Sequence, residues 1–366
     1  MRVVVCGGGV IGATAAYFLS RRGAEVTVVE RTGIACAASG KSGGFLALDW
    51  CDGSPLEALA RRSFALHAEL ADELGGEAWG YRRMTTFGGH AGAHGPGRGG
   101  GPVRWLSEAV TVSRRLGTPE TTAQAHPGAF TAAMMRAAQD AGASLRIGRV
   151  TELARDGGRV VGVEMEGEAV AADAVVVAMG PWSILASLWL PLPAVYGLRG
   201  HSVVFETGAA LPAEAVFLEY EEGRGETHAP ELFPRADGTT YVCAISSDSP
   251  LPVDPAEVEP DEGAIARLEA MCRRISPALA QAPVLARQAC HRPVTQDGLP
   301  LIGPVAGLDG AYVATGHSVW GILNAPATGE ALAELILDGA ARKLDLAPFD
   351  PGRLAPFDPA RLLGTR

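Results

Sequence analysis

The chain has 366 residues, of which 47% are hydrophobic and 20% charged. This composition excludes a disordered protein, and the length leaves room for two domains with sizeable cores. The formal net charge of −10 argues against nucleic acid and anionic membrane surfaces as partners.

Targeting and metal signals are weak along the whole sequence. We find no signal peptide before the first strand and no apolar run that would span a bilayer, so a cytoplasmic location is expected. The cysteines show no CxxC spacing, which favours reduced, buried thiols. His90 and His94 stand in the glycine-rich stretch 88–102, where a mobile loop is favoured over a metal site because no acidic or thiol partner is near. No metal is predicted.

The first thirty residues have the pattern of a βαβ unit. Arg2–Cys6 is a short β-branched run typical of a buried parallel strand. Residues 11–22 have helical spacing and end at Gly23, and residues 25–30 form a second buried strand. Strand, turn, helix and strand in this order predict a nucleotide-binding fold of the Rossmann type.

The turn between the first strand and the helix reads GGGVIG and predicts a dinucleotide site. Gly7 permits the tight turn, Gly9 lets the backbone approach a diphosphate at the helix N-terminus, and Gly12 allows close packing of helix on strand. Glu30, at the end of the second strand, would accept hydrogen bonds from ribose hydroxyls. A glycine turn in a fold without nucleotide is the alternative, and the strand–helix–acid context argues against it.

A second stretch favours FAD over NAD. Residues 38–45 read ASGKSGGF, and these small and hydroxyl-bearing residues suit a chain running beneath a ribityl phosphate and a flavin. An NAD dehydrogenase has no need of such a segment. FAD is therefore the expected cofactor.

The remaining pattern predicts a second, inserted region. Helices are expected at 55–74, 127–141, 261–275 and 322–337, and strands at 144–151, 159–165, 174–178 and 311–315. Residues 196–245 are β-rich with turn signals, which indicates an antiparallel sheet. We therefore expect an α/β protein with a Rossmann-type FAD-binding domain and an inserted α+β substrate domain built on an antiparallel sheet. The expected segments are 1–83, 127–190 and 291–366 for FAD, and 84–126 and 191–290 for substrate.

Two strings near the C-terminus carry a family resemblance: RPVTQDGLPLIGP at 292–304 and ATGHSVWGILNAPATG at 314–329. With the N-terminal glycine turn, they resemble the D-amino-acid oxidase superfamily, which includes glycine oxidase and monomeric sarcosine oxidase. The strings GFLALDW at 44–50, TTAQAHP at 121–127 and PELFPRADG at 230–238 are similar to a branch of fungi, plants and bacteria without a characterised substrate.

The resemblance implies an FAD-dependent amine or amino-acid oxidase or dehydrogenase. The C–N bond of a small amine or amino acid would be oxidised by hydride transfer to flavin N5, giving an imine that hydrolyses, with O2 or another electron acceptor. Flavin oxidation of a 2-hydroxy acid, and a flavin-binding protein without a catalytic role, are the alternatives.

The resemblance also implies roles for two residues. Arg292 would pair with a substrate carboxylate, to which its planar fork is suited, and a salt bridge with Asp297 is the alternative. Cys290 stands where sarcosine-oxidase-type relatives bond covalently to the flavin, although many relatives bind FAD without a covalent bond. Covalent attachment is therefore open.

The inferred substrate sheet carries further candidates. Glu231 could orient an ammonium, or it could be exposed or paired with Arg235. One or more of Tyr220, Phe233 and Tyr241 would face the flavin.

The C-terminal string has its own physical interpretation. Gly316 and Gly321 let the backbone approach a flat ring, and the helix starting near Ile322 aims its positive end there, which favours reduced flavin. Pro326 would fall in the first turn, where a missing N–H costs nothing. An ordinary glycine-started helix is the alternative.

The chain departs from the sarcosine-oxidase pattern in its lysines. Sarcosine-oxidase-type members carry a lysine on the substrate sheet that helps flavin react with oxygen, and neither Lys41 nor Lys343 can occupy that strand. Arg199, His201 or Lys41 are candidates for the positive charge, so oxidase and dehydrogenase stay open.

The expected site residues fall into two groups. Catalytic candidates are Arg292, Glu231, Tyr241 and His317. Cofactor-binding candidates are Gly7, Gly9, Val10, Ile11, Gly12, Glu30, Arg31, Ser39, Lys41, Ser42, Gly43, Val150, Gly180, Trp182, Cys290, Gly316, His317, Gly321 and Ile322.

Overall fold

A computed structural model describes residues 1–92, 101–208, 211–223 and 225–363. Its first layer is a six-stranded sheet in the order β19-β20-β12-β1-β2-β8, parallel except for β19, which runs antiparallel to β20. The strands are β1 (Arg2–Cys6), β2 (Glu25–Glu30), β8 (Ser144–Ile147), β12 (Ala174–Val177), β19 (Leu301–Pro304) and β20 (Ala311–Thr315).

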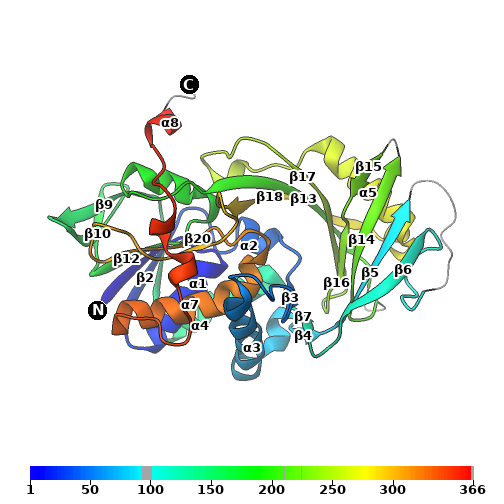
Figure 1. Cartoon of the computed structure of the whole chain (residues 1–366), viewed down its shortest axis with the longest axis horizontal. Coiled ribbons are helices and arrows are strands. Elements are labelled where there is room, and N and C mark those ends of the chain that lie inside the picture. The colour runs from blue at the N-terminus through cyan, green and yellow to red at the C-terminus, as the bar shows by residue number, and fades with distance from the viewer. Residues whose placement is uncertain (93–100, 209–210, 224, 364–366) are drawn as a thin grey trace.

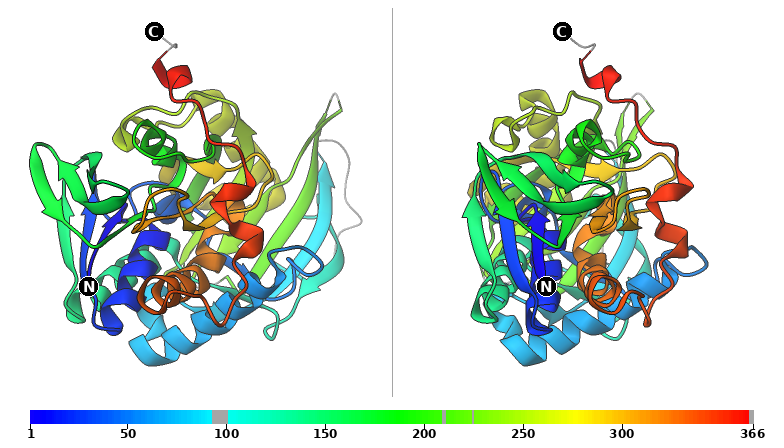
Figure 2. Two further views of the ribbon diagram at one scale, coloured as in Figure 1. Left: turned by 60° about the vertical axis from the view of Figure 1, so that its left-hand side comes forward. Right: turned by 90° about the vertical axis from the view of Figure 1, so that its left-hand side faces the viewer.

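Strand β1 shows how the sheet is covered on both faces. Val3 and Val5 point into a core formed with the helices, whereas Val4 and Cys6 point into a second core on the opposite face. The helical face is covered by α1 (Val10–Arg21), α4 (Pro127–Asp140) and α7 (Gly321–Asp338), with α3 (Glu57–Leu74) packed on α7. The other face carries a three-stranded antiparallel sheet of β9 (Val150–Asp156), β10 (Arg159–Met165) and β11 (Glu168–Ala171) (Figure 2).

The second layer is an eight-stranded sheet in the order β18-β13-β17-β16-β14-β5-β6, with β15 beside β14. In Figure 1 it stands to the right of the six-stranded sheet, with α5 (Glu262–Ile275) on its outer face. Ile265, Leu268 and Met271 of α5 pack there on strand residues such as Val203 and Val242. The strands are β5 (Thr85–Gly92), β6 (Val110–Gly117), β13 (Tyr196–Glu206), β14 (Glu214–Gly223), β15 (Glu226–His228), β16 (Glu231–Pro234), β17 (Thr239–Ser247) and β18 (Val284–Val294).

Short elements complete the described chain. A three-stranded sheet joins β3 (Phe45–Ala47), β7 (Thr122–Gln124) and β4 (Arg82–Arg83). The remaining helices are α2 (Ala38–Lys41), α6 (Pro277–Gln281), α8 (Ala360–Leu363), and the 3₁₀ turns η1 (Gly76–Trp79), η2 (Gly180–Leu188), η3 (Pro255–Glu257), η4 (Ser318–Trp320), η5 (Ala347–Phe349) and η6 (Pro351–Arg353).

The expected fold class is confirmed, with three corrections in its elements. The second sheet is mixed, not purely antiparallel, because β14 pairs in parallel with β5. The strand expected at 144–151 is two strands, β8 and β9, because Gly148 turns the chain and its N–H bonds to the Glu30 carbonyl at the sheet edge. The loop expected at 88–102 is wrong for residues 88–92, which belong to β5, and residues 93–100 lie outside the described residues.

Two other expectations meet the structure only in part. His90 is an exposed residue of β5, and His94 lies outside the described residues. The division into domains stays a prediction, and β18 runs across the boundary expected at residue 290.

The expectation for Pro326 is wrong, because α7 begins at Gly321 and the proline lies inside the helix. A proline there has no N–H for the Ile322 carbonyl. His67 of α3 forms a hydrogen bond with this carbonyl instead, and its Nε2 lies 2.9 Å from the Ile322 oxygen. Ser63 Oγ accepts the neighbouring Ala327 N–H at 3.0 Å. Helix α3 therefore completes the hydrogen bonding of α7 at the end that faces the site.

Candidate functional site

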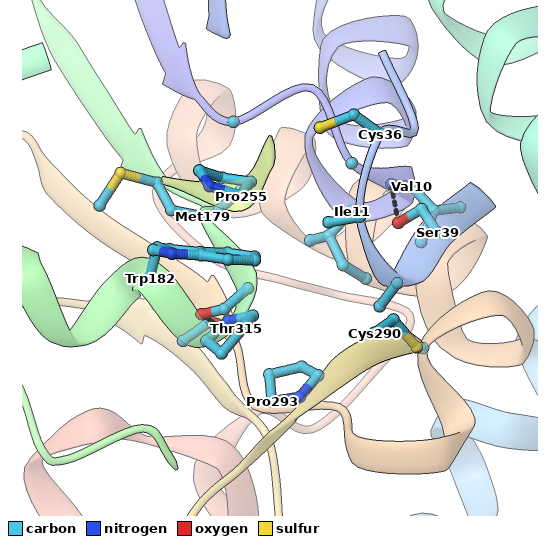
Figure 3. Close-up of a pocket in the computed structure, with 18 of the residues that line it drawn as sticks. Val10, Ile11, Cys36, Ser39, Met179, Trp182, Pro255, Cys290, Pro293 and Thr315 are labelled. Carbon is cyan, nitrogen blue, oxygen red and sulfur yellow. Dashed lines mark hydrogen bonds between the residues drawn. The ribbon is translucent and has the colours of Figure 1, made fainter. Parts of the chain in front are cut away.

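A large cavity lies at the carboxyl ends of β1, β2, β12 and β20, and extends to the inner face of the eight-stranded sheet. Open α/β sheets bind ligands at this edge. Figure 3 shows Val10, Ile11 and Ser39 across the cavity from Met179 and Trp182. The cavity therefore connects the glycine turn to the substrate sheet.

The three glycines of the turn have different surroundings. Gly7 has φ of 115°, and a Cβ there would lie 2.4 Å from the Ala178 oxygen. A Cβ at Gly12 would lie 1.9 Å from the Gly7 oxygen, which explains the close packing of helix on strand. A Cβ at Gly9 would meet Ser39 Oγ at 3.1 Å and would otherwise enter the cavity that Gly9 lines. Gly12 itself does not line the cavity.

The start of α1 fits the diphosphate of FAD. Helix α1 has no acidic residue in its first turn, and Gly9 at the N-cap provides no side-chain cap. Helix starts leave N–H groups without intrahelical acceptors and carry a partial positive charge. Ser39 Oγ accepts the Val10 N–H at 2.9 Å, as Figure 3 shows, and so holds residues 38–41 beside this turn.

Glu30 and Arg31 line the same end of the cavity. The Glu30 carboxylate accepts the N–H of Gly8 at 2.6 Å and that of Thr32 at 2.8 Å. Arg31 donates to the Val253 carbonyl at 2.7 Å and to Asp254 at 3.1 Å. Glu30 thus fixes the shape of the turn, and its contact with a ribose stays a prediction.

The middle of the cavity has the close backbone approach expected for a flat ring. Gly180 and Gly316 both have positive φ, 55° and 80°, and both line the cavity. A Cβ at Gly316 would lie 2.6 Å from Thr295 Cγ2. Trp182 is held by a hydrogen bond from its Nε1 to the Pro252 carbonyl at 2.8 Å. Val150, Gly321 and Ile322 also line the cavity, as expected.

His317 is a buried residue of this wall. Its Nε2 lies 3.0 Å from Thr328 Oγ1, while its Nδ1 is buried without a hydrogen-bond partner among the described residues. Burial lowers the pKa of His317 to about 3, so the imidazole is neutral near pH 7. An unpartnered nitrogen in the cavity wall suits a hydrogen-bonding ligand such as a flavin.

Arg292 lies at the substrate end of the cavity. Its Nη1 donates to Ser246 Oγ at 2.8 Å, and its guanidinium lies across Gly200, where a Cβ would come within 3.0 Å of Cζ. The alternative pairing with Asp297 is wrong, because Asp297 binds Arg353 at 2.7 Å. Arg292 therefore keeps its fork available to the cavity.

Glu231 and Tyr241 line the cavity near Arg292. The alternative pair of Glu231 with Arg235 is wrong, because Arg235 donates to the Ser42 carbonyl at 2.9 Å and lies 5.1 Å over the Tyr241 ring. Burial raises the pKa of both Glu231 and Tyr241. The cavity thus contains one carboxyl group and one guanidinium at its substrate end.

Cys290 and His201 also line this end. Burial raises the pKa of the Cys290 thiol and lowers the pKa of His201. Both effects favour the neutral forms near pH 7. His201 is therefore not the expected positive charge, and Arg199 bonds to Ser247 Oγ at 3.3 Å.

Lys41, Tyr220 and Phe233 lie outside the cavity lining, as Gly12 and Arg199 do. Lys41 ends α2, and Lys343 pairs with Glu330 at 2.6 Å, so both lysines are absent from the eight-stranded sheet, as expected. Tyr220 is buried in the core beneath α5. Phe233 lies behind the lining, where a Cβ at Gly43 would come within 2.4 Å of its ring.

Gly200 and Ser246, which contact the Arg292 guanidinium, were not predicted from the sequence. The glycines at 197 and 200 inside the long strand at 196–206 were an available signal, since such glycines mark close approach of another group. Ser246 carried no signal in the sequence.

Comparisons with known proteins agree with this geometry. The family described as "FAD dependent oxidoreductase" matches residues 2–335. A Schizosaccharomyces pombe protein, provisionally named an oxidoreductase, is 32% identical and covers 95% of this chain and 97% of its own length. Glycine oxidase of Pseudomonas aeruginosa is 30% identical, covering 96% of this chain and 99% of its own. The crystal structure of glycine oxidase from Geobacillus kaustophilus superposes with a TM-score of 0.82, at 26% identity, covering 96% of this chain and 99% of that chain.

The chain belongs to this family of FAD-dependent oxidoreductases, and it is an enzyme of that class. The family resemblance drawn from the two C-terminal strings is confirmed. FAD is the cofactor of the family, and the glycine turn, the helix start without an acidic residue in its first turn and the unpartnered His317 nitrogen fit it. Among the described residues, no helix has the length and apolar character needed to cross a membrane.

Proposed function

We propose that this enzyme oxidises the C–N bond of a small amine or amino acid, and that Arg292 binds the carboxylate of an amino-acid substrate. One observation carries the proposal: a single cavity extends from the glycine turn to an arginine and a carboxyl group on the eight-stranded sheet. The relatives named glycine oxidase support the amino-acid class.

The residues of the cavity have separate roles in this proposal. Gly9 and the first turn of α1 hold the diphosphate of FAD, and Gly316, His317 and Gly321 border its ring system. Bound FAD supplies the acceptor for the hydride that the α-carbon loses. Arg292 holds the substrate carboxylate through two charge-assisted hydrogen bonds, which fixes the α-carbon in position.

Glu231 distinguishes an amine from an alcohol substrate. Its carboxylate would attract an ammonium, whereas the hydroxyl of a 2-hydroxy acid brings no positive charge to offset it. A 2-hydroxy acid would therefore bind less well beside Glu231, which favours C–N oxidation over the alternative.

The test is anaerobic reduction of the purified holoenzyme with a panel of amino acids, N-methyl amino acids, simple amines and 2-hydroxy acids. We expect amino acids to bleach the flavin absorbance and to release ammonia or an amine. Bleaching by 2-hydroxy acids alone would support the other oxidation, and no bleaching by any amine would contradict the proposal. Reoxidation of the reduced protein by O2, compared with an artificial acceptor, then separates oxidase from dehydrogenase.

A further inference from the structure

Glu231 is the one cavity-lining carboxylate on the described part of the eight-stranded sheet. It begins β16, where it lies opposite Cys243 of β17 and Phe217 of β14. Cys243 Sγ donates to Glu231 Oε2 at 3.6 Å, and the charge of Arg292 acts on the carboxylate without forming an ion pair in the described chain. A lining carboxylate without a bound cation has capacity for a further partner.

The other titratable groups that line this end of the cavity are neutral near pH 7, apart from Arg292. Burial raises the pKa of the thiols and of the phenol, and lowers that of the imidazole. Tyr241 and Cys243 belong to β17, Cys290 to β18 and His201 to β13. The neighbour of Glu231 on β14 is the apolar residue Phe217. Two further cations act on these neutral groups, Lys41 on Cys290 and Arg235 over the Tyr241 ring. Glu231 and Arg292 are thus the charged groups that line this end of the cavity.

This charge pattern matches a zwitterion. Arg292 and Glu231 line the same cavity, so a substrate α-carboxylate would satisfy the first and its ammonium would satisfy the second. An ammonium has no lone pair, and oxidation of a C–N bond to an imine requires one on nitrogen. The substrate must therefore lose a proton inside the cavity or bind in its scarce neutral form.

We propose that Glu231 accepts the proton of the substrate ammonium, so that the zwitterion is the form that binds and the neutral amine is the form that reacts. This inference rests on the proposed function and specifies the substrate class as α-amino acids. In the step, an N–H bond of the ammonium breaks, an O–H bond forms on Glu231, and the electron pair of the broken bond stays on nitrogen. The charges of the ammonium and the carboxylate cancel.

Burial supports Glu231 as an acceptor. A carboxyl group whose pKa lies above its ordinary value holds a proton more readily than a glutamate in water. Arg292 offsets part of this rise in the pKa of Glu231, because its positive charge favours the ionised carboxylate. Before substrate arrives, Arg292 thus opposes the effect of burial on the pKa of Glu231. Neutralisation of that guanidinium by the substrate carboxylate favours proton uptake by Glu231 afterwards.

The test compares the rate of anaerobic flavin reduction as a function of pH in the wild-type holoenzyme and in Glu231→Gln. At pH 7 the variant should reduce its flavin at least about 10²-fold more slowly at subsaturating amino acid. Its rate should then rise tenfold per pH unit toward the pKa of the free amine, because only the neutral amine can react. The wild type should be much less dependent on pH over this range.

Two controls separate proton transfer from a structural role. Glu214→Gln changes a partly buried carboxyl group outside the cavity, which accepts from Trp105 Nε1 at 3.0 Å, and it should keep the wild-type pH profile. Glu231→Asp keeps a carboxylate that can accept the proton, so its flavin should be reduced more slowly than in the wild type but with the same pH profile. This variant also tests the inference if Glu231→Gln does not fold.

Two results would overturn the inference. One is a Glu231→Gln rate lowered equally at every pH, or not lowered at all. The other is a Glu231→Asp profile that rises steeply with pH. Reduction of the wild type by simple amines but by no amino acid would also overturn the inference, while the proposed C–N oxidation stands. If neither amines nor amino acids reduce the wild type, the proposed function fails instead, so the two failures are distinguishable.

Discussion

Removal of the Arg292 guanidinium should weaken binding of a carboxylate ligand while FAD stays bound. Arg292 projects from β18 into the substrate end of the cavity and donates to Ser246 Oγ at 2.8 Å. It has no carboxylate partner among the described residues, because Asp297 is taken by Arg353. Its fork can therefore form two charge-assisted hydrogen bonds to one ligand carboxylate.

The magnitude follows from those two bonds. Each hydrogen bond to a charged group is worth about 1.5–3 kcal/mol, and the lower part of that range applies because Arg292 is only partly buried. Arg292→Ala should thus reduce the binding free energy of a carboxylate ligand by about 3–4 kcal/mol, which raises its dissociation constant on the order of 10²–10³-fold. Arg292→Lys keeps the charge but loses the fork, so roughly a tenfold loss is expected.

The assay is titration of the holoenzyme with a carboxylate analogue that cannot be oxidised, followed by the flavin spectrum. Ser246→Ala is the matched control, because it removes only the hydrogen bond to the guanidinium and should change the dissociation constant a few-fold. A role for Arg292 in carboxylate binding is refuted if Arg292→Ala retains FAD and binds the analogue within about threefold of the wild type.

Four further predictions test other parts of the structure. Gly200→Ala should weaken binding of the same analogue about tenfold without loss of FAD, since the new Cβ would meet Arg292 Cζ at 3.0 Å. An unchanged dissociation constant would show that Gly200 does not position the guanidinium. Gly9→Val should give a folded protein by circular dichroism that purifies without flavin and takes up none. A yellow variant would argue against binding of the FAD diphosphate at the glycine turn. Acid precipitation should leave FAD in the supernatant, because burial raises the pKa of Cys290 and disfavours a thiolate; a yellow pellet would show a covalent bond. His67 is neutral in the fold down to a pKa of about 4, whereas the unfolded chain takes up that proton near 6.5, so stability should fall by roughly 3 kcal/mol as pH drops through this window. Denaturant unfolding of His67→Gln should lack that part of the loss, and an unchanged pH dependence would contradict the assignment.

Local patterns made the nucleotide end of the cavity predictable. The turn with Gly7, Gly9 and Gly12 lies between a strand and a helix that are contiguous in sequence, so each glycine's surroundings follow from short-range geometry. Ser39, predicted from its small neighbours, does lie beside this turn, where it binds the Val10 N–H. Lys41, in the same helix, does not line the cavity, because a four-residue helix directs its side chains in several directions.

The contacts at the substrate end of the cavity could not be predicted, because they depend on the order of the strands in the sheet, which no local sequence pattern encodes. Strand β13 lies between β17 and β18, so Gly200 comes diagonally beside Arg292, which pairs with Leu198. The pairing of Glu231 with Arg235 was a reasonable short-range expectation, but Arg235 turns toward the Ser42 carbonyl in the other layer. The parallel pairing of β5 with β14 joins segments more than a hundred residues apart and had no signal in either segment.

The central claim is that one cavity holds FAD along the glycine turn and an amino-acid carboxylate at Arg292. A crystal structure of the holoenzyme with a bound carboxylate analogue tests it most directly. The account predicts the diphosphate against Gly9 and the start of α1, with both carboxylate oxygens within hydrogen-bond distance of the Arg292 guanidinium and with Glu231 facing the α-carbon side. A carboxylate bound elsewhere in the cavity, with Arg292 still bonded only to Ser246, would contradict it.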